Sequence, residues 1–162
     1  MRIAVLSLAP ACIFPPSLST DTTDAPANAP PAILAMHTQT QDLVEAGSIS
    51  EVVGVSDTMT VALVDPDAAD ILYVRMYVNY TTAKPVPPNV QCQAAPNGTA
   101  YRQATCDLTT LCLAPTTMTP SDDMEIVVFD REPLDSGSPA FMAIPPDGFS
   151  ASKYLHLTCT TP

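Results

Sequence analysis

The sequence contains no tryptophan, only five glycines and only six lysine and arginine residues among its 162 positions. So few basic residues exclude nucleic acid as a partner, because proteins that bind nucleic acid neutralise its phosphates with Lys and Arg. With so little glycine, the chain has no glycine-rich loop of the kind that cradles phosphate groups. No apolar run approaches the roughly 20 residues that a bilayer-spanning helix requires.

Acidic residues and proline are abundant by contrast. Seventeen Asp and Glu residues give a formal net charge of -11, and 18 residues are proline. Apolar residues make up 46% of the chain, which is enough to build one hydrophobic core and argues against a wholly disordered protein. The length of 162 residues suits one domain and a short tail.

The first residues have the pattern of a short secretory signal. Met1 and Arg2 give a positive start, residues 3–9 are an apolar run, and small residues at positions 9–11 precede Cys12. Residues 9–12 resemble the lipobox of bacterial lipoproteins, although Ala stands where Leu is usual and Pro is uncommon at the next position. This resemblance implies a signal peptide over residues 1–11 and an acylated Cys12 in the cell envelope, on the periplasmic or surface face of the outer membrane. A secreted protein without an anchor and an intracellular protein with an apolar start are the alternatives.

The cysteine count agrees with export. If Cys12 carries lipid, four cysteines remain, and in an oxidising compartment they form two disulfides. Four cysteines allow three pairings, and the sequence does not decide between them. The favoured pairing joins Cys92 to Cys106 across a local hairpin and Cys112 to Cys159 on the last strand, although the inward-facing leucines on either side of Cys112 disfavour the second pair. The alternative, a zinc site, lacks the usual ligand spacing between Cys106 and Cys112.

Residues 12–31 are rich in proline and threonine and predict a disordered, flexible tether. Residues 32–162 show no helical periodicity but many short runs that favour strands. In the clearest run, residues 72–79, apolar residues alternate with Tyr, Arg and Asn, as in a strand with one buried face. The nine expected strands cover residues 33–38, 49–55, 58–64, 70–80, 90–95, 100–105, 108–114, 124–130 and 154–160.

Strands at roughly ten-residue spacing predict an all-β, antiparallel sandwich of about 7–9 strands. Residues 28–33, 60–67 and 70–80 resemble the lead-in, second strand and third strand of immunoglobulin-like and cadherin-like domains. The resemblance implies an immunoglobulin-like sandwich. Without tryptophan, the Cys, Trp and Cys signature of a true immunoglobulin domain is missing.

Asp65, Asp67 and Asp70 follow the second expected strand, and Asp57 precedes it. Closely spaced carboxylates are the ligands that Ca²⁺ prefers, and the cadherin-like resemblance implies a calcium site at these residues. Asp-Pro-Asp is also an ordinary turn former, and that alternative predicts no metal.

Other side chains give weaker signals. Asp122, Asp123 and Glu125 suggest a turn with solvated charges. His37 and His156 are expected on the surface rather than in a catalytic site. The tyrosines at positions 73, 77 and 80 are either an exposed binding stripe or cross-strand stabilisers, and the second is favoured. Residues 133–150 form a proline-rich loop that we expect to pack over the sandwich.

No nucleophile elbow of the G-x-S-x-G type is present. The sequence therefore predicts a non-catalytic exported lipoprotein that carries one β-sandwich binding or structural module. We expect attachment to the membrane through the N-terminal lipid, no cofactor, and a protein or carbohydrate partner. A calcium-dependent adhesion domain and a small secreted hydrolase with an unrecognised site are the alternatives.

Overall fold

The computed structural model describes residues 28–112 and 122–162, so the expected signal peptide, Cys12 and most of the expected tether lie outside the described residues. The described chain is all β and contains no helix. Its strands are β1 (Ala32–Thr38), β2 (Asp42–Leu43), β3 (Ser48–Val52), β4 (Thr58–Val64), β5 (Leu72–Val78), β6 (Val90–Ala94), β7 (Tyr101–Asp107), β8 (Asp122–Phe129) and β9 (Ser150–Thr160). Among these residues there is accordingly no helix long and apolar enough to cross a membrane.

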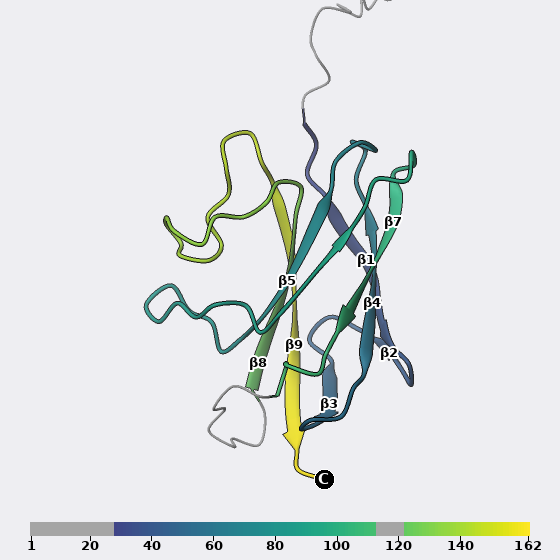
Figure 1. The fold of residues 1–162 in the computed structure, drawn as a ribbon, viewed down its shortest axis with the longest axis vertical. Coiled ribbons are helices and arrows are strands. Elements are labelled where there is room, and N and C mark those ends of the chain that lie inside the picture. The colour runs from purple at the N-terminus through teal and green to yellow at the C-terminus, as the bar shows by residue number, and fades with distance from the viewer. Residues whose placement is uncertain (1–27, 113–121) are drawn as a thin grey trace, which may run out of the picture.

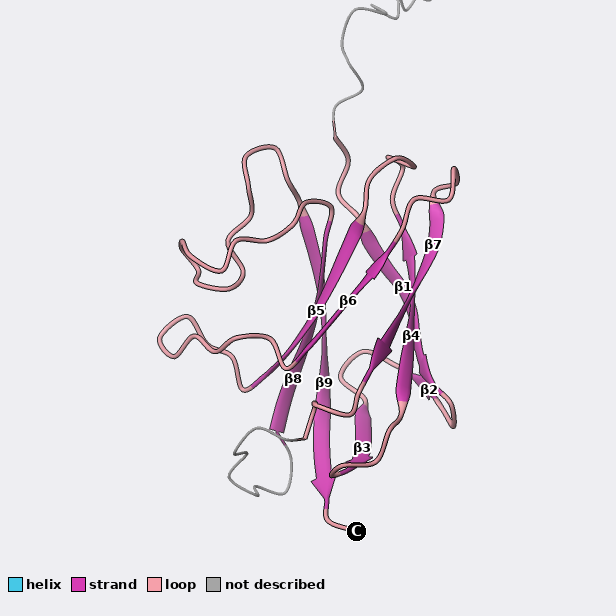
Figure 2. Ribbon diagram, viewed as in Figure 1, coloured by secondary structure: helices cyan, strands magenta, loops and turns pink. Residues whose placement is uncertain are grey.

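The strands form two sheets that face each other (Figure 1). The smaller sheet has the order β2-β1-β4-β7, and the larger sheet has the order β3-β9-β8-β5-β6 (Figure 2). Every pairing is antiparallel except that of β3 with β9, which is parallel. The predicted immunoglobulin-like sandwich is therefore confirmed, with one parallel pair at the edge of the larger sheet.

The core lies between the sheets and is built from alternate residues of the strands. In β4, Met59, Val61 and Leu63 are fully buried while the residues between them are half-buried on the outer face. The same alternation buries Leu155 and Leu157 of β9. Since neighbouring residues of a strand point to opposite faces, the period of two in the sequence becomes one apolar face on each sheet.

Two parts of the strand prediction need correction. The segment expected as a strand over residues 108–114 is a turn over its described residues 108–112, where the Leu111 amide donates to the Leu108 carbonyl oxygen at 2.8 Å. Leu108 and Leu111 are buried. The apolar run that resembles a strand therefore belongs to a turn whose leucines pack into the core. The two-residue strand β2 was not expected, because two residues carry no periodicity.

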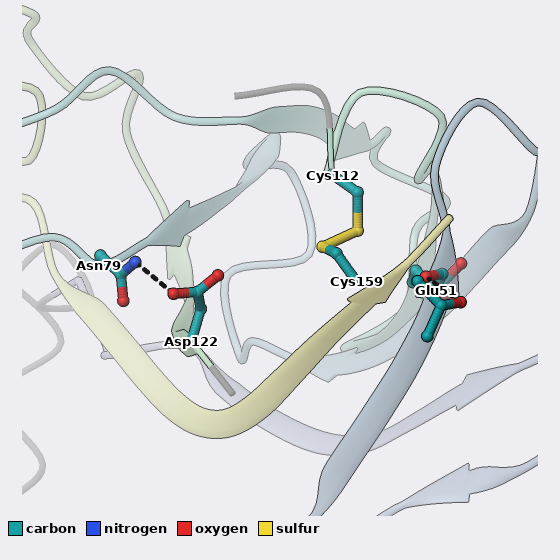
Figure 3. Close-up of a disulfide and its surroundings, with 6 residues drawn as sticks. Glu51, Asn79, Cys112, Asp122 and Cys159 are labelled. Carbon is teal, nitrogen blue, oxygen red and sulfur yellow. Dashed lines mark hydrogen bonds between the residues drawn. A yellow bond between two sulfur atoms is a disulfide. The ribbon is translucent and has the colours of Figure 1, made fainter. Parts of the chain in front are cut away.

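Both disulfides have the favoured pairing, but Cys92–Cys106 closes no hairpin, because β6 and β7 belong to different sheets. Cys92 of β6 pairs with Cys106 of β7, with their Cα atoms 5.2 Å apart, and so links the two sheets. Cys112, in the turn after β7, pairs with Cys159 of β9, with Cα atoms 5.7 Å apart (Figure 3). Because Cys112 lies in a turn, the alternation of a strand does not govern the direction of its side chain.

The last residues of the expected tether contact the sandwich. The Asn28 side-chain amide donates to a carboxylate oxygen of Asp130 and to the carbonyl oxygen of Asp147, both at 2.6 Å. The Ala29 amide donates to the Asp67 carboxylate at 2.9 Å. Residues 28 and 29, which the sequence assigns to the tether, therefore contact the domain.

Candidate functional site

A long loop between β8 and β9 crosses the outer face of the larger sheet. We call residues 130–149 the covering loop; Figure 1 shows it in yellow-green on the side of the larger sheet that faces away from the smaller one. Within it, Leu134 and Ala143 form an isolated β-bridge. This position confirms the expectation that the proline-rich segment packs over the sandwich.

Arg75, on the outer face of β5, holds the covering loop. Its side chain is buried although the alternation in β5 predicts an exposed position. One guanidinium nitrogen lies 3.0 Å from the Asp135 carboxylate and 3.0 Å from the Phe141 carbonyl oxygen, and the other donates to the Pro133 carbonyl oxygen at 3.2 Å. A single side chain thus binds three points of the loop, and its charge has partners instead of being buried alone.

Two tyrosines make a second set of contacts with the loop. The Tyr77 hydroxyl donates to the Phe141 carbonyl oxygen at 2.6 Å, and the Tyr80 hydroxyl donates to the Ala140 carbonyl oxygen at 2.8 Å. Their rings meet edge to face with centroids 5.3 Å apart. Burial raises the pKa of Tyr77 to about 12. The three expected tyrosines are therefore not one exposed stripe, because the covering loop buries Tyr77 completely.

A small apolar cluster lies between the loop and the sheet. Tyr77, Val127 and Phe129 are its buried members, and Phe141 and Met142 of the loop pack against them. Phe141 has a left-handed backbone with φ of 64°, which is uncommon for a residue other than glycine. The hydrogen bonds that its carbonyl oxygen accepts from Arg75 and Tyr77 help to fix that conformation.

The covering loop leaves a groove on each side. The groove along β8 and β9 has a volume of about 440 Å³ and a lining of both apolar and polar side chains. Its lining residues are Glu125, Val127, Phe129, Ser138, Pro139, Met142, Ile144, Ser150, Ala151 and Ser152. The groove along β5 and β6 is smaller, at about 310 Å³, and more polar. It is lined by Tyr73, Val74, Arg75, Gln91, Cys92, Gln93 and Glu132.

Among the described residues no loop covers the outer face of the smaller sheet, which carries a third groove of about 410 Å³. Leu34, Ala62, Tyr101 and Gln103 line it together with Leu63, Asn97 and Arg102. Asn97 belongs to the exposed turn before β7, where its side chain donates to the Tyr101 carbonyl oxygen at 3.0 Å.

The predicted calcium ligands lie in one loop, but each carboxylate has a different partner. Asp65 is fully buried, accepts a hydrogen bond from the Asp67 amide at 2.9 Å, and lies 3.4 Å from a guanidinium nitrogen of Arg102. Burial raises the pKa of the Asp65 carboxyl above its usual value. Asp70 forms an ion pair with Arg131.

Asp67, the third predicted ligand, directs one carboxylate oxygen to the Ala29 amide. The hydrogen bond from the Asp67 amide to Asp65 is the side-chain to backbone contact typical of an Asp-initiated turn. Residues 28–112 and 122–162 contain no group of three or more His, Cys, Asp or Glu side chains that could hold a metal ion. Calcium binding at these residues stays a prediction, and any such site would have to displace the present partners.

Of the remaining candidates, His156 and Asp123 lie together, whereas His37 lies on a strand of the other sheet. His156 is exposed on β9, and its ring nitrogen lies 3.4 Å from the Asp123 carboxylate, while His37 is half-buried on β1. The Asn79 side chain donates to Asp122 at 2.7 Å near the Cys112–Cys159 disulfide (Figure 3). Beside Cys159 in the ladder, Glu51 is buried, and burial raises the pKa of its carboxyl.

The sequence interpretation missed the role of Arg75 and the burial of Tyr77. One signal for them exists in β8, where Ile126, Val127, Val128 and Phe129 form an unbroken apolar run. Such a run is typical of a strand that is buried on both faces. It indicates that something covers the outer face of that sheet, but it does not identify the covering segment.

Comparison of the chain with protein-family models, with curated proteins and with solved structures finds no match in any of the three.

Proposed function

We propose that this chain is a non-catalytic binding module of the bacterial cell envelope, exported and anchored through lipid on Cys12. The observation that carries the binding role is the covering loop, which Arg75 and Tyr77 fix against the sheet with a groove on either side. A rigid sandwich that presents a fixed loop and adjoining grooves is a common way to build a binding surface.

The two disulfides support export. Cystine persists in the periplasm and at the cell surface, whereas the cytosol keeps thiols reduced. The sequence around Cys12 supports the lipid anchor through its resemblance to a lipobox. We expect the anchor to lie in the outer membrane, on its periplasmic or surface face.

The placement of the titratable side chains supports a role without catalysis. Neither histidine lines any of the three grooves, and the serines of the β8–β9 groove have no imidazole beside them. In the commonest serine hydrolases, a histidine within hydrogen-bond distance activates the serine nucleophile. We therefore propose a protein or carbohydrate partner rather than a substrate.

Replacing Cys12 tests the anchor. The native chain and the Cys12→Ser variant are expressed from the natural start in a Gram-negative host, and membranes are separated from soluble fractions. We expect the native chain in the membrane fraction, with the mass of residues 12–162 plus acyl groups, and the variant in the soluble fraction. Ser17→Ala is the control and should stay with the membrane.

Two outcomes would refute the anchor. Membrane association that survives Cys12→Ser would show that lipid on Cys12 is not the attachment. An unprocessed mass with free thiols would remove export as well, since the signal peptide would then be retained and the disulfides unformed.

A further inference from the structure

The groove along β5 and β6 has the side chains of a small-molecule site. Its volume of about 310 Å³ lies at the lower end of the range of roughly 300–1,000 Å³ that is typical of such sites. Two strands and one end of the covering loop build it, because Glu132 lies in the loop and the other lining residues lie on β5 and β6.

The strand register sets the side chains of this groove next to one another. Tyr73 lies opposite Gln93, and Arg75 lies opposite Gln91 in the antiparallel ladder. Because residues that face each other across a ladder point to the same side of the sheet, all four side chains share the outer face. Gln91 and Gln93 are exposed, and Tyr73 is half-buried.

The polar groups that remain available in the groove are two uncharged amides, the Tyr73 hydroxyl and one carboxylate. The guanidinium of Arg75 is already bound by the covering loop. Gln91, Gln93 and Glu132, by contrast, make no side-chain hydrogen bond to any of the residues that the structure describes. Each amide offers two donors and an acceptor to a ligand, and the carboxylate offers acceptors.

A neutral sugar matches this set of groups. Adjacent hydroxyls of a sugar ring accept and donate side by side, as a glutamine amide does, and a tyrosine ring gives an apolar surface with a polar tip. Anionic ligands do not match it, because Glu132 lies in the groove and the chain has a net charge of -11. The lining residues offer no free cationic side chain to which an anionic ligand could bind.

We propose that the β5–β6 groove binds an uncharged saccharide, with the Tyr73 ring against the C–H face of one sugar and the Gln91 and Gln93 amides on its hydroxyls. This inference rests on the proposed function only in treating the chain as a binding module. It does not depend on the lipid anchor. It names the class of ligand and the residues that contact it.

Polysaccharide binding by the full-length, oxidised chain tests the proposal. The probes are insoluble cellulose, chitin, xylan and mannan in sedimentation assays, with soluble hexasaccharides of those that bind in titration calorimetry. Polygalacturonate is the anionic probe. We expect binding to at least one neutral polysaccharide and none to polygalacturonate.

The variants locate the binding site. Gln91→Ala combined with Gln93→Ala should weaken binding about tenfold, because each hydrogen bond to an uncharged partner corresponds to a few-fold in affinity. Gln39→Ala is the matched control, since Gln39 is an exposed glutamine just after β1 in the other sheet and lines none of the three grooves. It should bind like the unaltered chain.

The aromatic ring is tested separately. Tyr73→Phe keeps the ring and should retain binding within a few-fold, whereas Tyr73→Ala should abolish it. Thermal unfolding of each variant shows whether a loss of binding is a loss of fold. If Tyr73→Ala does not fold, the glutamine variants still decide the question because their side chains are exposed.

Three results would overturn the proposal: no binding to any neutral probe, equal binding to polygalacturonate, or unchanged affinity in the double glutamine variant. The membrane experiment on Cys12 is unaffected by all three. Failure of the saccharide site is therefore distinguishable from failure of the proposed envelope location.

Discussion

Tyr77 is buried although its position in the strand predicts an exposed side chain. It alternates with the core residues of β5 and so points away from the core, yet its side chain is fully buried. The covering loop supplies both an apolar contact, through Phe141, and an acceptor for the hydroxyl. A tyrosine suits such a position because it joins a large apolar surface to a polar tip.

The raised pKa of Tyr77 predicts a loss of stability at high pH. The unfolded chain ionises this tyrosine near its ordinary pKa of 10.0, whereas the folded chain ionises it only near about 12. The stabilising effect is complete below pH 10 and is lost between pH 10 and 12, by about 1.4 kcal/mol per pH unit. Urea unfolding at pH 8 and pH 11 should show a loss about 1.4 kcal/mol larger for the native chain than for Tyr77→Phe. Equal losses in both proteins would contradict the assignment.

At the scale of elements, β5 contributes side chains to both faces of the larger sheet. Its inward residues Leu72, Val74 and Met76 belong to the core, and its outward residues Arg75 and Tyr77 hold the covering loop. Loss of an inward residue would open a cavity in the core, whereas loss of an outward residue would release the loop. The two kinds of change therefore affect different parts of the molecule.

Arg75→Met should release the covering loop while the sandwich stays folded. The change removes a charged donor from the Pro133 and Phe141 carbonyl oxygens, and we expect a cost of about 2–3 kcal/mol in the free energy of unfolding. Hydrogen exchange should rise in residues 133–149 and stay low in β4. Lys84→Met, at an exposed position, is the control. Unchanged exchange in the loop would show that Arg75 does not hold it.

At the scale of the molecule, the two disulfides link parts that the hydrogen-bond ladders do not join. Cys92–Cys106 connects the edge strands β6 and β7 of opposite sheets, and Cys112–Cys159 connects the turn after β7 to the last strand. The first closes a separation of 14 residues and the second closes one of 47. A longer closed loop restricts the unfolded chain more, so the second bond should stabilise more.

Paired alanine variants test this order. Chain entropy predicts a loss of about 3 kcal/mol for Cys92→Ala with Cys106→Ala, and of about 4 kcal/mol for Cys112→Ala with Cys159→Ala. Either loss is a large share of the roughly 5–15 kcal/mol typical of a folded domain. Urea unfolding of both variants and of the fully reduced native chain measures the losses. A greater loss in the first variant would contradict the entropic argument.

The sequence was a better guide to strands than to the candidate site. Alternation in β4 and β9 correctly predicted which side chains enter the core. An apolar residue at every second position is enough to identify a strand and its buried face. The site depends on contacts between Arg75 and the covering loop, about 60 residues apart along the chain. No local pattern contains that information.

By itself the sequence determined the class of fold, since alternating apolar residues and frequent turn formers leave a two-sheet sandwich as the way to bury one face of each strand. Its low content of basic residues also predicts that nucleic acid is not a partner. Only the tertiary structure decided that the outer face of the larger sheet is covered, that Tyr77 and Arg75 are buried, and that Asp65 pairs with Arg102. The physical reason is that burial of an outward-facing residue depends on which distant segment packs over it, and that packing forms only when the whole chain has folded.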